Sequence, residues 1–251
     1  MPGAAAVTGT GVLVTGGYGS IGRATLARLA ALRVELIAVD QMPLPSDVAA
    51  LVRREITVDL LDDAEVARCL GRDVPPLNHV IGIAGGGDVE ELSQSDPATE
   101  SLEIFSRVVT HNLHVAFITV RNCVPLLRRA TGDRSITLVG SINGYGGYGA
   151  PGYSAAKAGV SGLVGTLATP LGAEGIRINC LAPGTVDTEN LRLLAERRGV
   201  ELDLDAVAER APLRRVLTPD DVARSLVAIA LDMPGLTGAT VVLDNGQTLI
   251  R

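Results

Sequence analysis

A serine, a tyrosine and a lysine lie in one glycine-rich segment at spacings that suit acid–base chemistry. Tyr153 and Lys157 are four residues apart in the stretch YSAAK, so a helix would place both side chains on one face. A phenol is a weak base at neutral pH because its ordinary pKa is about 10, and a neighbouring ammonium group favours the phenolate. Ser141 ends the preceding β-rich run and could hydrogen-bond a substrate oxygen. These three residues predict a site that transfers a proton to or from an oxygen atom.

Two further tyrosines lie between Ser141 and Tyr153. Residues 140–157 contain three of the four tyrosines of the chain, which has two Phe and no Trp. Tyr145 and Tyr148 have no lysine one helical turn away. We expect them either to line a substrate pocket, because a phenol offers an apolar ring and a polar tip, or to pack the loop.

A second group of chemically suggestive residues lies near the N-terminus, where VLVTGGYGSIGRATLARLA reads as strand, glycine turn and helix. Glycines let a backbone turn sharply and approach a pyrophosphate closely, and the free N–H groups at the start of the helix attract its negative charge. At the first turn of a parallel sheet, this pattern predicts a dinucleotide site. The residues expected to form it are Gly16, Tyr18, Gly19, Ser20, Ile21 and Gly22.

Asp40 ends the second predicted strand, about 20 residues beyond the glycine turn, where an acid accepts hydrogen bonds from the adenosine ribose hydroxyls. The same carboxylate would repel a 2′-phosphate, and no Arg or Lys occurs among the next residues, Gln41, Met42 and Pro43. We therefore predict NAD rather than NADP as the cofactor. Asp59 and Leu60 follow the third predicted strand and could contact the adenine, although Asp59 could equally cap the next helix.

The elements that must position these residues alternate along the chain. Seven apolar, β-branched runs are predicted as strands, at residues 11–15, 34–40, 55–59, 78–85, 135–141, 176–184 and 239–244. Their continuous apolar character is typical of strands covered on both faces. Helical patterns occupy residues 20–32, 62–70, 101–129, 152–171 and 219–231. This alternation predicts an α/β fold, a doubly wound (Rossmann-type) parallel seven-stranded sheet with helices on both faces.

Residues 185–217 interrupt this alternation, since they carry charged helical patterns and no strand. Ligands in such folds bind beyond the carboxyl ends of the strands, so this insertion is expected to be a substrate lid or, with equal weight, a pair of surface helices. We find no linker or repeat, and residues 1–251 are expected to form one domain.

Composition excludes several classes of protein. The net charge of −6 and the scattered Arg-Arg pairs argue against a nucleic-acid partner. Cys69, Cys123 and Cys180 are widely spaced, which argues against a metal site or a disulfide framework and predicts buried small apolar residues. Neither a basic leader nor an uninterrupted run of 18 apolar residues occurs, so we expect a cytoplasmic protein without a membrane partner.

With these motifs combined, the chain resembles the short single-domain branch of the short-chain dehydrogenase/reductase family, from about Gly11 to Gly246. The matching pieces are TGGYGSIG, Asp59-Leu60, Ala84-Gly85, HNLHVAF with Asn112, Ser141, YSAAK, IRINCLAPGTVDT and LTGATVVLDNG. The resemblance implies a general acid/base role for Tyr153 and a substrate-orienting role for Ser141. It also implies that Lys157 binds the nicotinamide ribose and lowers the pKa of Tyr153, and that Asn112 supports a water-linked proton relay through Lys157.

The resemblance further implies that several residues after the fourth and sixth predicted strands lie along the cofactor. These residues are Ala84, Gly85, Pro183, Gly184, Val186 and Thr188, with Tyr153 and Lys157 also in contact with it. A dimeric or tetrameric assembly of identical chains is expected from the same resemblance.

Four departures from the family pattern stand out. Ser20 replaces a usual glycine, which gives a spacing typical of the longer, sugar-nucleotide-modifying branch, and Ile83 replaces a usual asparagine. The interval from Ser141 to Tyr153 is one residue shorter than usual. Pro170 is expected to kink or end the long helix, because proline has no N–H to donate.

We therefore expect an NAD(H)-dependent oxidoreductase that interconverts a secondary alcohol and a ketone by hydride transfer. Two alternatives stay open: a non-catalytic NAD-binding sensor or scaffold, and an epimerase or dehydratase that uses NAD transiently.

Overall fold

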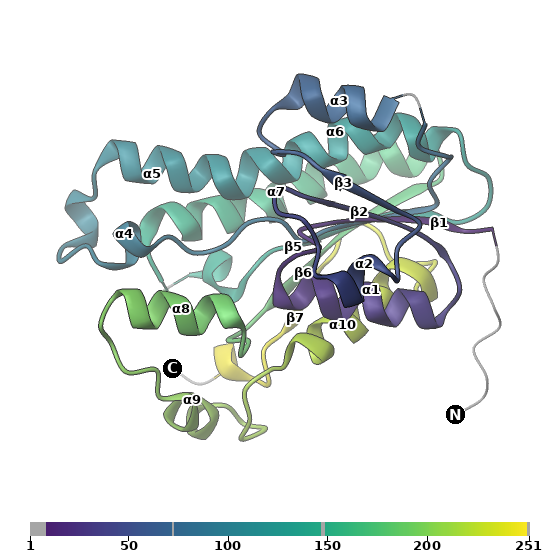
Figure 1. The fold of residues 1–251 in the computed structure, drawn as a ribbon. Coiled ribbons are helices and arrows are strands. Elements are labelled where there is room, and N and C mark those ends of the chain that lie inside the picture. Colours follow the sequence, from purple (N-terminus) through teal and green to yellow (C-terminus); the bar gives the residue numbers. More distant parts are fainter. Residues whose placement is uncertain (1–8, 72, 147–148, 250–251) are drawn as a thin grey trace.

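Seven parallel strands form the centre of the protein (Figure 1). The computed structural model describes residues 9–71, 73–146 and 149–249. The strands are β1 (Gly11–Thr15), β2 (Glu35–Asp40), β3 (Arg54–Thr57), β4 (His79–Gly82), β5 (Arg134–Val139), β6 (Ile176–Pro183) and β7 (Thr240–Leu243). Their order in the sheet is β3-β2-β1-β4-β5-β6-β7, so the direction of winding reverses between β1 and β4. Ligands of such sheets bind at the carboxyl ends of the strands beside this reversal.

Helices cover both faces of the sheet, and each face has its own apolar core (Figure 1). One face is covered by α3 (Asp63–Gly71), α6 (Val115–Arg128) and α7 (Pro151–Ala173), with α5 (Leu102–Val109) packed on α7. The other face is covered by α1 (Ser20–Ala31), α2 (Ser46–Ala49) and α10 (Pro219–Val227). Because both faces are covered, all residues of β1 and β6 are buried. The predicted doubly wound parallel sheet is confirmed.

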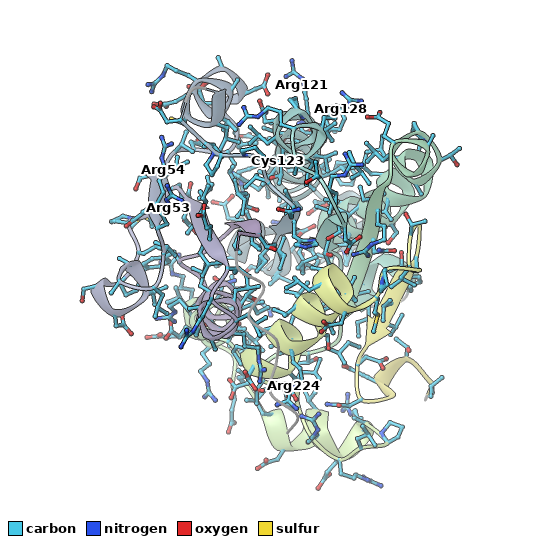
Figure 2. All side chains as sticks on the ribbon, turned by 90° about the vertical axis from the view of Figure 1, so that its right-hand side faces the viewer. Arg53, Arg54, Arg121, Cys123, Arg128 and Arg224 are labelled. Carbon is cyan, nitrogen blue, oxygen red and sulfur yellow. The ribbon has the colours of Figure 1, made fainter. Side chains whose placement is uncertain are left out.

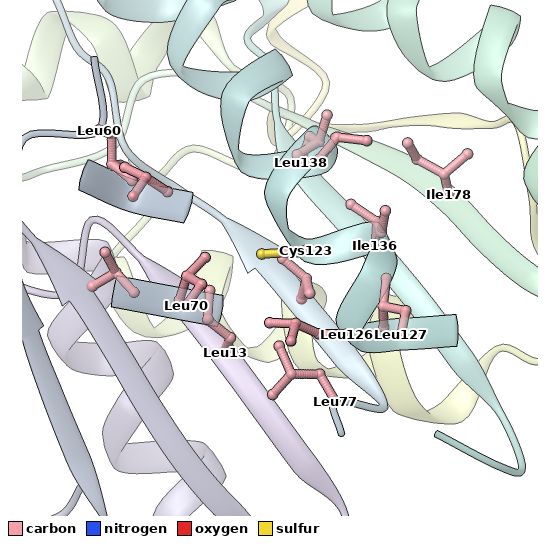
Figure 3. Packing of buried hydrophobic residues seen from close by; sticks show 14 of the residues in the cluster. Leu13, Leu60, Leu70, Leu77, Cys123, Leu126, Leu127, Ile136, Leu138 and Ile178 are labelled. Carbon is pink, nitrogen blue, oxygen red and sulfur yellow. The ribbon is translucent and has the colours of Figure 1, made fainter. Parts of the chain in front are cut away.

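The core between α6 and the sheet contains Cys123 (Figure 3). Its neighbours in the same apolar cluster include Leu13, Leu70 and Leu126, and burial raises the pKa of its thiol to about 12. Cys180 is also buried and free, as expected, whereas Cys69 is only partly buried. Among the described residues no group of three or more His, Cys, Asp or Glu is arranged to hold a metal ion.

The longest predicted helices differ in detail from the structure. The stretch expected as one helix over residues 101–129 is α5 and α6 joined by a π-helical turn, η2 (Thr110–His114). Pro170 was expected to kink or end its helix; an end at this residue is wrong, since α7 continues to Ala173. Pro170 and Thr166 are exposed, so water can bond the carbonyl of Thr166 that would otherwise accept from residue 170.

The insertion at residues 185–217 holds two helices, α8 (Glu189–Arg197) and α9 (Leu204–Arg210). The sequence did not suggest α4 (Val89–Leu92), which follows β4. Short helical turns complete the described chain: η1 (Pro97–Thr99), η3 (Ile142–Tyr145), η4 (Ala228–Asp232) and η5 (Gln247–Leu249). In the part of the chain that the structure describes, every helix is too short or too polar to cross a membrane.

The arginines are distributed over different sides of the molecule (Figure 2). Arg53 pairs with Glu35, Arg121 with Asp63, Arg128 with Glu174 and Arg224 with Asp220. Because each of these cations faces a carboxylate of the same chain, they form no common basic surface.

Candidate active site

Ser141 and Tyr153 meet at the carboxyl end of the sheet. Ser141 directly follows Gly140 after β5 and accepts a hydrogen bond through Oγ from the backbone N–H of Asn143, at 3.2 Å. Tyr153 lies in the first turn of α7, which begins at Pro151, a residue suited to that position because its missing N–H is not needed there. The Ser141 hydroxyl is close enough to the Tyr153 phenol to lower its pKa. The expected close approach of these hydroxyls is therefore present.

Glycines make this approach possible. A Cβ on Gly144 would lie 2.8 Å from the backbone nitrogen of Ala158, so η3 packs directly on the backbone of α7. A Cβ on Gly140 would lie 2.6 Å from Sγ of Cys180, in the neighbouring strand β6. Larger residues at either position would push the Ser141 segment away from α7.

Lys157 lies one helical turn after Tyr153 and is buried, with 3% of its surface exposed. Its Nζ donates a hydrogen bond to the carbonyl of Val139, at 3.1 Å, and lies 5.5 Å from the centroid of the Tyr153 ring. Burial disfavours the ammonium form and lowers the pKa of Lys157 to about 8. The side chain is thus held beside the tyrosine ring at the end of β5.

The surrounding protein disfavours ionisation of the Tyr153 phenol. Burial raises the pKa of Tyr153 to about 12; the hydrogen bond with Ser141 lowers it, and the negative charge of Glu91 raises it further. This net increase in the pKa of Tyr153 is opposite to the decrease that the family resemblance implies. The protein by itself therefore presents a phenol that can donate a proton at neutral pH.

Asn112 lies in the π-helical turn η2 and is buried. Its Nδ2 donates to the carbonyls of Gly86 and Val108, both at 3.0 Å, and its Oδ1 accepts from the N–H of Gly86, also at 3.0 Å. A Cβ on Gly85, whose φ is +129°, would lie 2.8 Å from that Oδ1. Asn112 therefore braces the loop after β4. Its role in a proton relay stays a prediction.

The glycine turn after β1 forms a close backbone cradle. A Cβ on Gly22 would lie 2.0 Å from the carbonyl oxygen of Gly16, and a Cβ on Gly16 would lie 2.7 Å from the backbone nitrogen of Ala84. The N-cap of α1 is Gly19, which has no side chain to bond the first N–H groups of the helix. Those N–H groups and the positive end of the helix dipole suit a pyrophosphate. The residues present thus fit a dinucleotide.

Asp40 and Asp59 lie where the second and third strands end. The carboxylate of Asp40 accepts hydrogen bonds from the N–H groups of Tyr18, at 2.9 Å, and Met42, at 3.0 Å. These bonds hold it beside the glycine turn, partly exposed, with lone pairs left for ribose hydroxyls. Asp59 accepts from the N–H of Leu61 at 2.9 Å, so it has a local turn-forming role, and Leu60 is buried.

The segment after β6 lies at the same edge of the sheet. Gly184 donates its N–H to the carbonyl of Leu243 at 2.8 Å, and Val186 pairs with Leu217 in an isolated bridge. Thr188 caps α8 by accepting from the N–H of Leu191 at 3.1 Å. Tyr145 is half-exposed in η3, and Tyr148 lies outside the described residues.

The insertion is attached to the glycine turn by contacts that the sequence did not suggest. Ser20 accepts a hydrogen bond from the N–H of Glu189 at 3.2 Å, and Arg23 pairs with the Glu189 carboxylate. A cavity of about 340 Å³ lies here, lined by Ser20, Arg23, Asp187, Thr188, Glu189, Arg192 and Pro219. It adjoins the start of α1 and does not include Tyr153.

Glu91 is another residue near the site that the sequence did not indicate. It is buried in α4, and its Oε1 accepts a hydrogen bond from the N–H of Tyr153 at 2.8 Å. Because residues 91 and 153 are far apart in the chain, no local spacing connects them. The sequence offered one local indication of Glu91, namely an acid shortly after the glycines that follow β4.

Comparison with known proteins supports the fold and shows the family. The family model described as enoyl-(acyl carrier protein) reductase matches residues 16–248. An uncharacterized short-chain type dehydrogenase/reductase of Sinorhizobium fredii is 32% identical over 247 residues, which are 94% of this chain and 43% of that protein. The chain thus spans less than half the length of that relative.

Two other proteins match over most of their lengths. An uncharacterized oxidoreductase of Schizosaccharomyces pombe is 32% identical over 244 residues, covering 96% of this chain and 91% of the relative. The crystal structure of levodione reductase has a TM-score of 0.83 and 27% identity, covering 96% of this chain and 98% of that one. This chain therefore belongs to the short-chain dehydrogenase/reductase family of oxidoreductases.

Proposed function

We propose that the protein is an NAD(H)-dependent oxidoreductase that interconverts a secondary alcohol and a ketone, with Tyr153 as the general acid/base. The observation that carries the proposal is the position of Lys157, whose Nζ lies 5.5 Å from the centroid of the Tyr153 ring, with the Ser141 hydroxyl near the same phenol. This group and the glycine turn both lie at the carboxyl edge of the sheet, where ligands of doubly wound folds bind.

The chemistry assigned to the chain is the movement of one proton. A bound nicotinamide supplies the hydride donor or acceptor. In reduction, the Tyr153 phenol donates its proton to the developing alkoxide while the Ser141 hydroxyl orients that oxygen. In oxidation, the Tyr153 phenolate takes the proton of the substrate hydroxyl. The protein raises the pKa of Tyr153 to about 12, so the residue is a phenol at neutral pH, the form that reduction requires.

Asp40 supports NAD as the cofactor. Its carboxylate is held beside the glycine turn by the N–H groups of Tyr18 and Met42. A fixed negative charge there accepts hydrogen bonds from ribose hydroxyls and opposes a 2′-phosphate.

A carbonyl substrate is supported by the resemblance to levodione reductase, whose name describes a reductase. The helices α8 and α9 lie beyond the end of β6 and would border the substrate, with α8 held to the glycine turn through Glu189. We also propose that the protein is a homodimer or homotetramer. Leu102 on α5 and Phe117 on α6 are exposed apolar side chains that such an interface would cover.

The test is Tyr153→Phe, measured with a panel of ketones and secondary alcohols by absorbance of NADH. Turnover is expected to fall by at least about 10²-fold, the usual contribution of a positioned acid or base. NAD affinity, measured by calorimetry, should stay within about threefold of the wild type, which would show that the fold and cofactor site are intact. A variant that keeps most of its rate on a verified substrate would exclude Tyr153 as the acid/base.

A further inference from the structure

The carboxylate of Glu91 lies at the N-terminus of α7, the helix that carries Tyr153 and Lys157. Glu91 is 2% exposed, and its Oε1 accepts a hydrogen bond from the backbone N–H of Tyr153 at 2.8 Å; the backbone N–H of Gly152 also favours the charged form of this carboxylate and lowers its pKa. A Cβ on Gly152 would lie 2.8 Å from Oε1 of Glu91, so glycine at this position lets the carboxylate reach the helix.

Helix α7 depends on this contact because it has no cap of its own. Its N-cap residue, Ala150, has no side-chain acceptor, and the first turn contains no acid. The first N–H groups of a helix need acceptors, and negative charge near them is favourable. Glu91 supplies both from a different element.

Glu91 is itself held in place from two sides. The N-cap of α4 is Asp88, which accepts from the N–H groups of Glu90 and Glu91 at 2.9 and 3.0 Å. Arg107 of α5 donates to both oxygens of Asp88, at 3.1 and 3.2 Å. A continuous set of contacts therefore runs from α5 through α4 to the backbone of Tyr153.

The same carboxylate acts electrostatically on the phenol. The groups that face Tyr153 are the Ser141 hydroxyl, which lowers its pKa, the Glu91 charge, which raises it, and Lys157 beside the ring. Glu91 in turn faces the carboxylates of Glu100 and Asp88, which raise its own pKa together with burial, while the two N–H groups lower it.

Part of the Glu91 carboxylate is unpaired. Its Oε2 is buried without a hydrogen-bond partner among the described residues, as are both carboxylate oxygens of Glu100. A buried unpaired carboxylate oxygen costs free energy, and a neutral amide could cap α7 through the same oxygen at lower cost. The presence of a charged carboxylate at position 91 is explained if its charge has a role besides capping α7.

We propose that Glu91 is a positioning residue of the active site: it orients Tyr153 by capping α7, and its negative charge opposes formation of the Tyr153 phenolate. This proposal rests on the acid/base role of Tyr153 proposed above. It assigns to α4 a direct influence on proton transfer, although α4 contributes no group to the reaction itself.

The experiment compares wild type with Glu91→Gln, which keeps the acceptor oxygen and removes the charge, and with Glu91→Ala, which removes both. Glu103→Gln, an exposed position at the start of α5, is the matched control for loss of one charge. All four tyrosines are replaced by 3-fluorotyrosine, whose more acidic phenol titrates while the protein is folded. The Tyr153 signal is followed by ¹⁹F NMR and assigned with Tyr153→Phe.

Removal of the charge is expected to shift the titration midpoint at position 153 down by about 0.5 to 1 pH unit in Glu91→Gln. The alkaline limb of the pH profile for reduction should move in the same direction, since a more acidic phenol loses its proton earlier. Glu91→Gln should melt within a few degrees of the wild type, whereas Glu91→Ala should melt clearly lower because α7 loses its cap. Glu103→Gln should leave the midpoint unchanged.

Equal Tyr153 midpoints in wild type and Glu91→Gln would overturn the proposal and leave Glu91 as a helix cap alone. The NMR titration needs no turnover. A protein that shows the shift but reduces no ketone would therefore contradict the proposed function while retaining the influence of Glu91 on Tyr153.

Discussion

The Ser141 hydroxyl lies near the Tyr153 phenol and lowers its pKa, although Ser141 follows β5 and Tyr153 lies in the first turn of α7. The connecting segment lies directly on α7, because a Cβ on Gly144 would come within 2.8 Å of the backbone of Ala158. A short connection is therefore compatible with the contact: the turn η3 brings Ser141 back to the start of the helix.

Ser141→Ala should impair turnover without impairing cofactor binding. The substitution removes the hydrogen bond that lowers the pKa of Tyr153 and the hydroxyl proposed to orient the substrate oxygen. Loss of one such donor typically costs about 10²-fold in kcat. Steady-state kinetics should show this loss, with calorimetric NAD affinity near the wild-type value. Ser106→Ala, an exposed position on α5, is the control, and equal rates for both variants would contradict the assignment.

Gly22→Ala should weaken cofactor binding and the fold together. The new methyl carbon would lie 2.0 Å from the carbonyl oxygen of Gly16, so α1 must move away from the glycine turn. We expect a loss of about 1–3 kcal/mol in the free energy of unfolding, from urea denaturation, and at least about tenfold weaker NAD binding. At Gly71 in α3, a Cβ has no neighbour within 4 Å, so Gly71→Ala should cause neither loss. Wild-type NAD affinity in Gly22→Ala would contradict the proposed cradle.

Asp40→Asn should reduce the preference for NAD over NADP. The amide retains one acceptor oxygen for Tyr18 or Met42 but removes the negative charge that opposes a 2′-phosphate. Hydrogen bonds to charged groups contribute about 1.5–3 kcal/mol, so the ratio of kcat/KM for NAD to that for NADP should fall at least about tenfold. Asp47→Asn, an exposed position on α2, should leave the ratio unchanged. An unchanged ratio in Asp40→Asn would refute this basis for cofactor choice.

The protein should lose stability in mild acid through His79. This side chain is buried in β4, with Nδ1 2.9 Å from Oγ of Ser135, which donates its own proton to the carbonyl of Ala230. Nδ1 is therefore the donor, and the ring is neutral. Burial lowers the pKa of His79 from 6.5 to about 4, so the unfolded chain binds the extra proton first.

The free energy of unfolding should therefore fall as the pH decreases from about 6.5 to about 4, by up to roughly 3 kcal/mol from this residue. Urea denaturation at several pH values should show a weaker dependence in His79→Gln. His111→Gln makes the same change at an exposed position and should behave as the wild type does. If His79→Gln keeps the full acid dependence, another group is responsible.

Local patterns were enough to predict the strands and the motifs. β1 was predicted at its observed residues 11–15, because a strand buried on both faces must be apolar at every position. The spacing of Tyr153 and Lys157 is also local, since four residues make about one turn of helix. Pro170 shows the limit of such reasoning: its effect depended on its exposure, which the local sequence does not contain.

The sequence by itself therefore determined the alternation of strands and helices, the glycine turn and the identity of the candidate acid/base, because each depends on residues close together in the chain. Only the tertiary structure decided which distant groups surround them. Glu91 caps α7, Asn112 braces Gly86, and Glu189 contacts Ser20, each across a long interval of sequence. Burial, the Ser141 hydroxyl and the Glu91 charge set the pKa of Tyr153, and they come together only when the helices pack on the sheet.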